Sequence, residues 1–207
     1  MDNPVGYFFY EGQRIPEPKP GCYNYVTAKN GVFKTIFSAF FDASVCVAQS
    51  NNIAGLERWF DGVVFKLPKI PYQLLHTVLA HARKAGDGGT VMRPIEQMYH
   101  FHYIGGRWRV AVPDQHATPG RVYYSGGDDN SIVLDLHSHH GMKAYFSDTD
   151  NKDELGCRFY AVIGKIYDKP EIVLRFGLYG DFLRLPVTAI FDGCMIKDLG
   201  GDVDDGY

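Results

Sequence analysis

Residues 136–150 read Leu-His-Ser-His-His-Gly-Met-Lys-Ala-Tyr-Phe-Ser-Asp-Thr-Asp, directly after a compact apolar stretch that is typical of a buried strand. His137 and His139 stand two positions apart at the end of that predicted strand, so their side chains share one face. Asp150 lies in the first turn of a short polar helix predicted for residues 148–155. A loop that folds back would bring Asp150 beside the two histidines. Two imidazoles and one carboxylate suit zinc, and three protein ligands leave a fourth position open for water.

Each part of this pattern also has an ordinary structural explanation. Ser147 with Asp150 is typical of a helix N-cap, in which a serine precedes an acid by three positions. His137 and His139 are also compatible with surface histidines at a strand end. Three neighbouring residues are further candidates. His140 and Asp148 are competing ligands, and Asp135 is a supporting or structural carboxylate. The occurrence of all these elements together favours the metal site.

The sequence on both sides of this segment predicts a mixed domain. An apolar stripe at helical spacing predicts a helix from Pro71 to Ala85, with Gly86 as its stop. The period then changes to two, and Gly105-Gly106 is typical of a tight hairpin turn. Strands are predicted at residues 95–104, 107–112, 122–124, 132–136, 158–166 and 172–178. This order of helices and strands indicates an α+β (mixed α/β) domain over residues 67–192.

The two ends of the chain have a different character. Residues 1–66 are predicted to form a β-rich N-terminal extension, in which Val32–Gln49 reads as strands or a short hairpin. Residues 193–207 form an acidic, glycine-rich tail that is expected to be frayed.

Composition excludes several classes of protein. The chain has 207 residues, of which 45% are apolar and 22% charged, so it is not a disordered chain. Its net charge of -3 argues against a protein held mainly by nucleic-acid phosphates. The sequence has neither a signal-peptide pattern nor a long apolar run, so we expect a cytoplasmic protein with no membrane partner. Its four cysteines are too widely spaced to predict a disulfide framework.

The pattern H-x-H, seven residues, S, two residues, D resembles the metal signature of the JAB/MPN (JAMM) metalloprotease family. His137, Ser138, His139, Ser147 and Asp150 match it without a gap. The family also has a glutamate at the start of the strand that follows its first long helix. Two glutamates are rivals for that place, and Glu96, after the helix, fits better than Glu57, before it. The resemblance implies a cytidine deaminase-like fold, a curved mixed β-sheet flanked by helices.

The resemblance also implies roles for these residues. His137, His139 and Asp150 would hold Zn²⁺, which lowers the pKa of a bound water towards about 7. Glu96 would take a proton from that water, and Ser147 would donate a hydrogen bond to the oxyanion. The implied reaction is hydrolysis of a peptide or isopeptide bond at the C-terminal tail of a ubiquitin-like or sulfur-carrier-like protein. The size and extension resemble bacterial members whose genes accompany a ThiF-type homologue of ubiquitin-activating enzymes.

Other readings remain open. Many family members have proline where this chain has His140 and Phe146, so the loop backbone can differ. A non-catalytic MPN-like interaction module and a DNA-associated protein resembling the RadC group are the alternative functions. His100 and His102 form a second H-x-H, but no acid follows them at a suitable spacing, so satisfied strand histidines are the better explanation.

Overall fold

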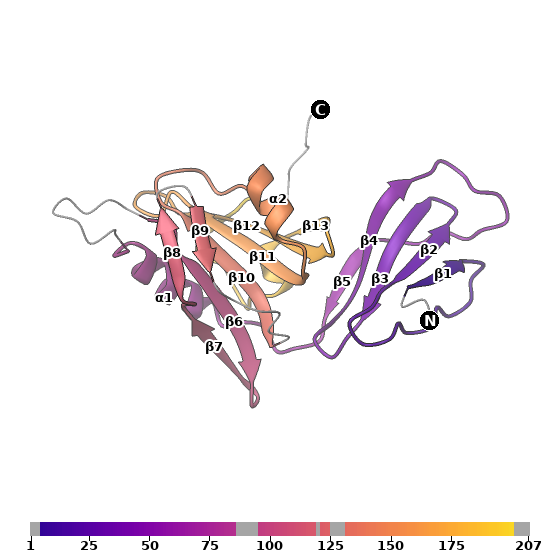
Figure 1. The fold of residues 1–207 in the computed structure, drawn as a ribbon, viewed down its shortest axis with the longest axis horizontal. Coiled ribbons are helices and arrows are strands. Elements are labelled where there is room, and N and C mark those ends of the chain that lie inside the picture. The colour runs from indigo at the N-terminus through magenta and orange to yellow at the C-terminus, as the bar shows by residue number, and fades with distance from the viewer. Residues whose placement is uncertain (1–4, 86–94, 119–120, 125–130, 201–207) are drawn as a thin grey trace. The chain divides into compact units, whose positions relative to one another are not determined.

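The computed structural model describes residues 5–85, 95–118, 121–124 and 131–200 (Figure 1). Contacts divide the chain into two compact units. The first contains Met1–Pro68 with Asp181–Leu183, and the second contains Lys69–Gly180 with Arg184–Tyr207.

A five-stranded sheet forms most of the first unit. Its strands are β1 (Gly6–Phe9), β2 (Asn24–Ala28), β3 (Gly31–Phe37), β4 (Phe41–Gln49) and β5 (Gly62–Phe65), and they lie in that order. β1 and β2 are parallel, whereas the later neighbours are antiparallel. Val26, Phe33 and Val45 are buried on it. The β-rich character of this part of the chain is confirmed, and β3 with β4 is the hairpin expected within Val32–Gln49.

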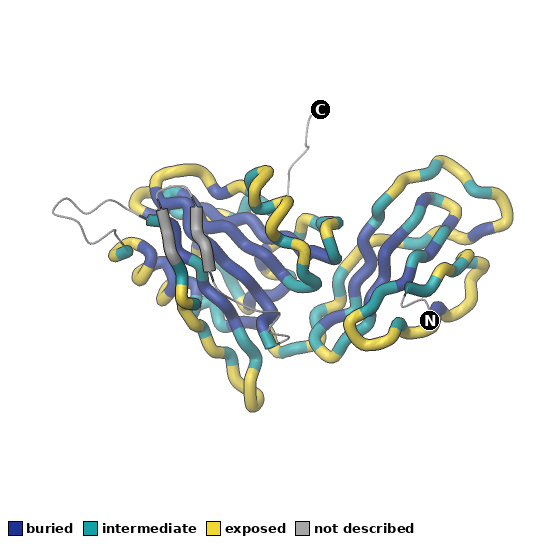
Figure 2. The backbone as a smooth tube through the Cα atoms, viewed as in Figure 1, coloured by how far each residue is buried: buried dark blue, intermediate teal, exposed yellow. Residues whose placement is uncertain are grey.

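A seven-stranded mixed sheet forms the centre of the second unit. Its main path runs β13-β12-β11-β10-β6-β7, β14 pairs with β12, and β8 pairs separately with β9. The strands are β6 (Met98–Ile104), β7 (Arg107–Ala111), β8 (Gln115–Thr118), β9 (Arg121–Tyr124), β10 (Ile132–His139), β11 (Cys157–Gly164), β12 (Glu171–Leu178), β13 (Asp181–Leu185) and β14 (Lys197–Asp198). β10 lies between parallel β11 and antiparallel β6. Every residue of β10 is buried, as is typical of a central strand covered on both faces (Figure 2).

Helices lie on both faces of this sheet. They are α1 (Tyr72–Ala82), α2 (Asp148–Asp153) and the short 3-10 helix η1 (Val187–Ala189). His81 of α1 contacts the hydroxyl of Tyr99, which lies opposite Leu136 in β10. Asp150 of α2 approaches His137, the next residue of β10. Because successive strand residues point to opposite faces, α1 and α2 cover opposite sides of β10. The α+β class with a mixed sheet and flanking helices is therefore confirmed.

Most predicted elements are present, with shifted ends. Gly105 and Gly106 have φ of +60° and +76°, so the tight turn between β6 and β7 uses the freedom that glycine has at positive φ. The first helix ends at Ala82 rather than Ala85, and Pro71 is its N-cap. Its predicted stop at Gly86 lies outside the described residues. The strand predicted from residue 95 begins at Met98, which leaves Glu96 just before it.

The chain end differs from the prediction over its described part. Instead of fraying from Gly193, the backbone pairs Lys197 and Asp198 with β12. The Asp198 carboxylate accepts hydrogen bonds from the backbone N–H groups of Val187 (2.7 Å) and Gly200 (2.8 Å), and the first of these bonds ties the segment to η1. All four cysteines are free, as expected. Within the described ranges, no helix has the length and apolar character needed to cross a membrane.

Candidate metal centre

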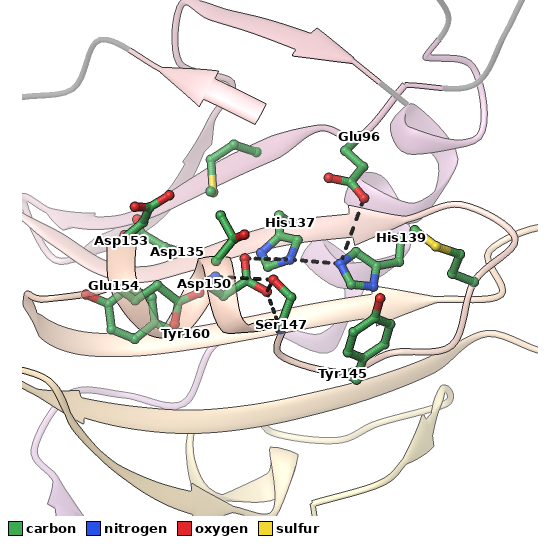
Figure 3. Close-up of a pocket in the computed structure, with 13 residues that line it drawn as sticks. Glu96, Asp135, His137, His139, Tyr145, Ser147, Asp150, Asp153, Glu154 and Tyr160 are labelled. Carbon is green, nitrogen blue, oxygen red and sulfur yellow. Dashed lines mark hydrogen bonds and ion pairs between the residues drawn. The ribbon is translucent and has the colours of Figure 1, made fainter. Parts of the chain in front are cut away.

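His137 and His139 lie at the end of β10, on the face that α2 covers (Figure 3). Their side chains are only 7% and 5% exposed, and their Nε2 atoms are 3.2 Å apart. Strand pairing fixes their positions, since His137 lies opposite both Met98 of β6 and Val162 of β11. Two buried ring nitrogens this close need a shared proton or cation, because two facing lone pairs are costly at low dielectric.

Asp150 reaches the histidines from the first turn of α2. Ser147 caps that helix: its hydroxyl accepts from the Asp150 N–H (3.2 Å), and Asp150 Oδ2 accepts from the Ser147 N–H (2.6 Å) and hydroxyl (2.7 Å). These bonds occupy Oδ2 and turn Oδ1 towards His137 Nε2, 3.7 Å away. The capping arrangement and the approach to the histidines are therefore two results of one geometry.

The three side chains fit a tetrahedral zinc ion. Donors at about 2.0–2.1 Å from zinc in tetrahedral geometry lie roughly 3.3 Å apart, close to the observed separation of the two imidazole nitrogens. One donor atom from each of His137, His139 and Asp150 lies within 4.8 Å of the others. Among the residues whose side chains are described, no other set of three histidine, cysteine or carboxylate donors meets that distance.

The protonation of both histidines also suits a metal ligand. His139 Nδ1 lies 3.1 Å from the carbonyl oxygen of Lys143, so it carries the proton and leaves the Nε2 lone pair free. Burial is the largest cause that lowers the pKa of His137, to about 4, and burial also lowers the pKa of His139. Both imidazoles are therefore neutral at pH 7, which is the form that binds metals.

Glu96 lies beside the histidine pair although it precedes the strand. The Ser138 hydroxyl accepts from the Gln97 N–H (3.1 Å), and the Ser138 N–H donates to the Gln97 carbonyl (3.0 Å). This pairing holds Glu96 Oε1 at 3.9 Å from His139 Nε2. Burial, with a smaller effect of the Asp150 charge, raises the pKa of Glu96 to about 7. A carboxyl group that titrates near neutral pH can both accept and return a proton.

Residues 75–176 match a family model described as prokaryotic homologs of the JAB domain. The match spans Glu96, both histidines, Ser147 and Asp150. This chain contains a JAB-family domain. The family includes peptidases, and membership alone assigns no activity to a particular member. No curated protein matches the chain significantly.

A cavity of about 310 Å³ opens over the candidate metal centre of the JAB domain. Besides the predicted residues, its lining includes Met98, Met142, Tyr145, Thr149, Asp153, Glu154 and Tyr160. Tyr145 packs against His139 with ring centroids 4.9 Å apart, and it is 45% exposed. These residues were not predicted, because the folded loop, α2 and the neighbouring strands β6 and β11 together bring them to the cavity. The one signal for them in the sequence was an aromatic residue, Tyr145, within the segment 136–150 that carries the candidate ligands.

The competing ligand candidates do not enter this cavity. His140 is buried, and its ring stacks on Tyr167 with a centroid distance of 6.4 Å. Asp148 is exposed and does not line the cavity. Asp135 lines the cavity, but it forms an ion pair with Arg158 (3.3 Å), and burial raises its pKa to about 6. His137, His139 and Asp150 therefore remain the candidate ligand set.

The residues that compete with Glu96 and with the His137–His139 pair lie in different surroundings. Glu57 is exposed and belongs to the first unit, whereas Glu96 is buried beside His139. His100 Nε2 lies 3.5 Å from Asp135, and His102 Nδ1 lies 2.9 Å from the hydroxyl of Ser131. The second H-x-H therefore consists of strand histidines with protein partners, as predicted.

Gly164 allows the loop that follows His139 to cross β11 at residues 142–144. A Cβ at this position would clash with the backbone of residues 142–144, including Met142 O at 2.6 Å. The Lys165 N–H donates to the Met142 carbonyl (2.7 Å), so the loop cannot move away without losing that bond. Gly164→Ala is therefore expected to destabilise the JAB domain by about 1–3 kcal/mol, as overpacking does. Urea unfolding monitored by circular dichroism measures this change.

Gly141 provides the matched control in the same loop. A Cβ there meets nothing within 4 Å, so Gly141→Ala is expected to change stability by less than about 0.5 kcal/mol. Equal stability of the two variants would contradict the close approach at Gly164.

Proposed function

We propose that this chain is a JAMM-type zinc metallopeptidase that hydrolyses peptide or isopeptide bonds. One observation carries the proposal: His137, His139 and Asp150 offer three donors within 4.8 Å of one another, and Glu96 lies at 3.9 Å from this set. The cavity above them gives a substrate bond access to the same place. A structural zinc site usually has four protein ligands, whereas three ligands beside a carboxyl base are typical of catalysis.

The side chains divide the work of the proposed reaction. His137, His139 and Asp150 hold the zinc ion through the atoms that face one another. When bound, zinc supplies a Lewis acid that polarises the scissile carbonyl and makes water nucleophilic near neutral pH. Glu96 takes one proton from the attacking water and transfers it to the nitrogen of the leaving amine as the C–N bond breaks.

The role of Ser147 as an oxyanion donor remains a prediction. Its hydroxyl donates to Asp150 Oδ2 at 2.7 Å, so donation to a substrate oxygen requires that bond to be given up. Holding the Asp150 carboxylate is the role that this bond supports directly.

The substrate we propose is the C-terminal tail of a ubiquitin-like or sulfur-carrier-like protein in the cytoplasm. The choice of this substrate rests on the resemblance to the JAB/MPN family. A narrower assignment to PRTRC system protein A, with a ThiF-type activating-enzyme homologue as its partner, rests on the same resemblance. An extended tail is suitable because main-chain hydrogen bonds to a sheet edge can hold it without a deep side-chain pocket.

A cleavage panel tests the proposed activity. Each ubiquitin-like or sulfur-carrier-like protein carries a reporter peptide on its C-terminus, joined either linearly or through a lysine side chain, and mass spectrometry locates the cut. We expect one class to be cut after its C-terminal residue, cleavage to stop with a zinc chelator, and cleavage to return with added zinc. Cleavage that persists under chelation would refute a zinc peptidase, and zinc binding without cleavage of any member would favour the interaction-module alternative.

A further inference from the structure

The helix that carries Asp150 has no apolar anchor. α2 is six residues long, and none of its residues is buried. A helix this short is unstable alone, since helix nucleation is unfavourable and isolated helices need about 12–15 residues to be even marginal. The Ser147 cap fixes only the first turn. Polar contacts from outside the helix must therefore hold Asp150 in place.

Arg175 of β12 provides those contacts. Its side chain is only 5% exposed. Its Nε and Nη2 donate to Glu154 Oε2 at 3.0 and 2.6 Å, and its Nη1 donates to Asn151 Oδ1 at 2.6 Å. The guanidinium also lies over the ring of Phe146, 3.8 Å from its centroid. Phe146 precedes Asp150 and Glu154 follows it. The Arg175 side chain therefore contacts the segment on both sides of the proposed ligand.

β12 holds the preceding loop from the same face. Alternation along the strand places Glu171, Val173 and Arg175 on one side of the sheet. Glu171 accepts from the Ala144 N–H at 3.1 Å and pairs with Lys165 at 3.0 Å. Val173 packs in a cluster with Ala144, against which Phe146 also lies. β12 is thus a continuous support for residues 144–154.

We propose that Arg175 is a positioning residue for the metal centre, acting through Glu154, Asn151 and Phe146 to hold Asp150 at the histidine pair. The inference rests on the proposed zinc site and deepens it. A buried ion pair is weak support for stability by itself, because desolvation of both charges offsets their attraction. This ion pair instead fixes geometry. The planar guanidinium of Arg175 forms hydrogen bonds in fixed directions and stacks on the Phe146 ring, and together these contacts define where α2 lies.

The test separates positioning from stability. Zinc affinity is measured by competition with a chromophoric chelator, at a temperature where circular dichroism shows each variant folded, and the cobalt-substituted proteins are compared by visible spectroscopy. The variants are Arg175→Lys, Arg175→Met and the double variant Arg175→Met with Glu154→Leu. In the double variant no unpaired buried charge remains, so its melting temperature is expected to lie nearer the parent than that of Arg175→Met.

We expect all three variants to bind zinc about 10–100-fold more weakly than the parent, as loss of outer supports does, with a shifted cobalt spectrum. Arg175→Lys keeps the charge and is expected to lose least. Arg184 serves as the control: it is exposed, and its guanidinium lies 5.4 Å from the same Phe146 ring, so Arg184→Ala should bind zinc as the parent does.

Parent-like zinc affinity in the folded double variant would overturn the positioning role, and so would an equal loss in Arg184→Ala. A parent protein that binds no zinc would instead overturn the proposed function, and this inference with it.

Discussion

Glu96→Gln is expected to keep zinc and to lower turnover by about 10²–10⁴-fold, the usual contribution of general acid–base catalysis. Glutamine has nearly the same shape and keeps a polar oxygen, but it cannot take up a proton at neutral pH. Glu96 is not in the ligand set, so the ion should stay bound. Steady-state kinetics on the cleaved substrate, together with metal analysis of the same samples, measures both effects.

The rival glutamate is the control for this substitution. Glu57 is exposed and lies in the first unit, so Glu57→Gln should turn over at the parent rate. Parent-like turnover by Glu96→Gln would show that Glu96 is not the base. Loss of turnover in Glu57→Gln would instead assign the role of the base to Glu57. The Glu96→Gln protein is also a substrate trap for identifying the partner by pull-down.

Replacing both His137 and His139 by alanine is expected to reduce bound zinc from about one ion per chain to none. Alanine offers no donor atom, and a single carboxylate is a poor zinc site at neutral pH. Activity should disappear with the metal. Elemental analysis after dialysis measures the zinc content, and circular dichroism establishes that the variant remains folded.

The second H-x-H of the chain gives a matched control for that loss. His100 and His102 lie on β6, with Asp135 and Ser131 as neighbours. A His100→Gln, His102→Gln double variant is expected to keep one zinc per chain. Loss of zinc from this variant, or its retention in the His137 and His139 variant, would place the metal elsewhere.

The sequence predicted the parts of the site that local spacing controls. Two histidines at alternate positions of one strand must share a face, and a Ser-x-x-Asp pattern forms a capping box at the residues expected. The Gly105-Gly106 turn was predicted for the same reason, because few residues other than glycine suit two successive positive φ angles.

Features that depend on long-range contacts were not predicted. Arg175 is a lone cation in a strand that is otherwise mostly apolar, which signals a buried partner but does not say which one. The partner is Glu154, 21 positions away, and the pairing of β11 with β12 brings the two residues together. The ordered Lys197–Asp198 strand was missed similarly, since acidic and glycine-rich composition favours a frayed end unless the sheet offers an edge.

Anomalous X-ray scattering above the zinc absorption edge, from crystals of the parent protein grown with zinc, shows whether His137, His139 and Asp150 hold the ion. We expect one strong peak about 2.0–2.2 Å from His137 Nε2, His139 Nε2 and one carboxylate oxygen of Asp150. Absence of a peak between these three side chains, or an Asp150 carboxylate turned away from the ion, would contradict it.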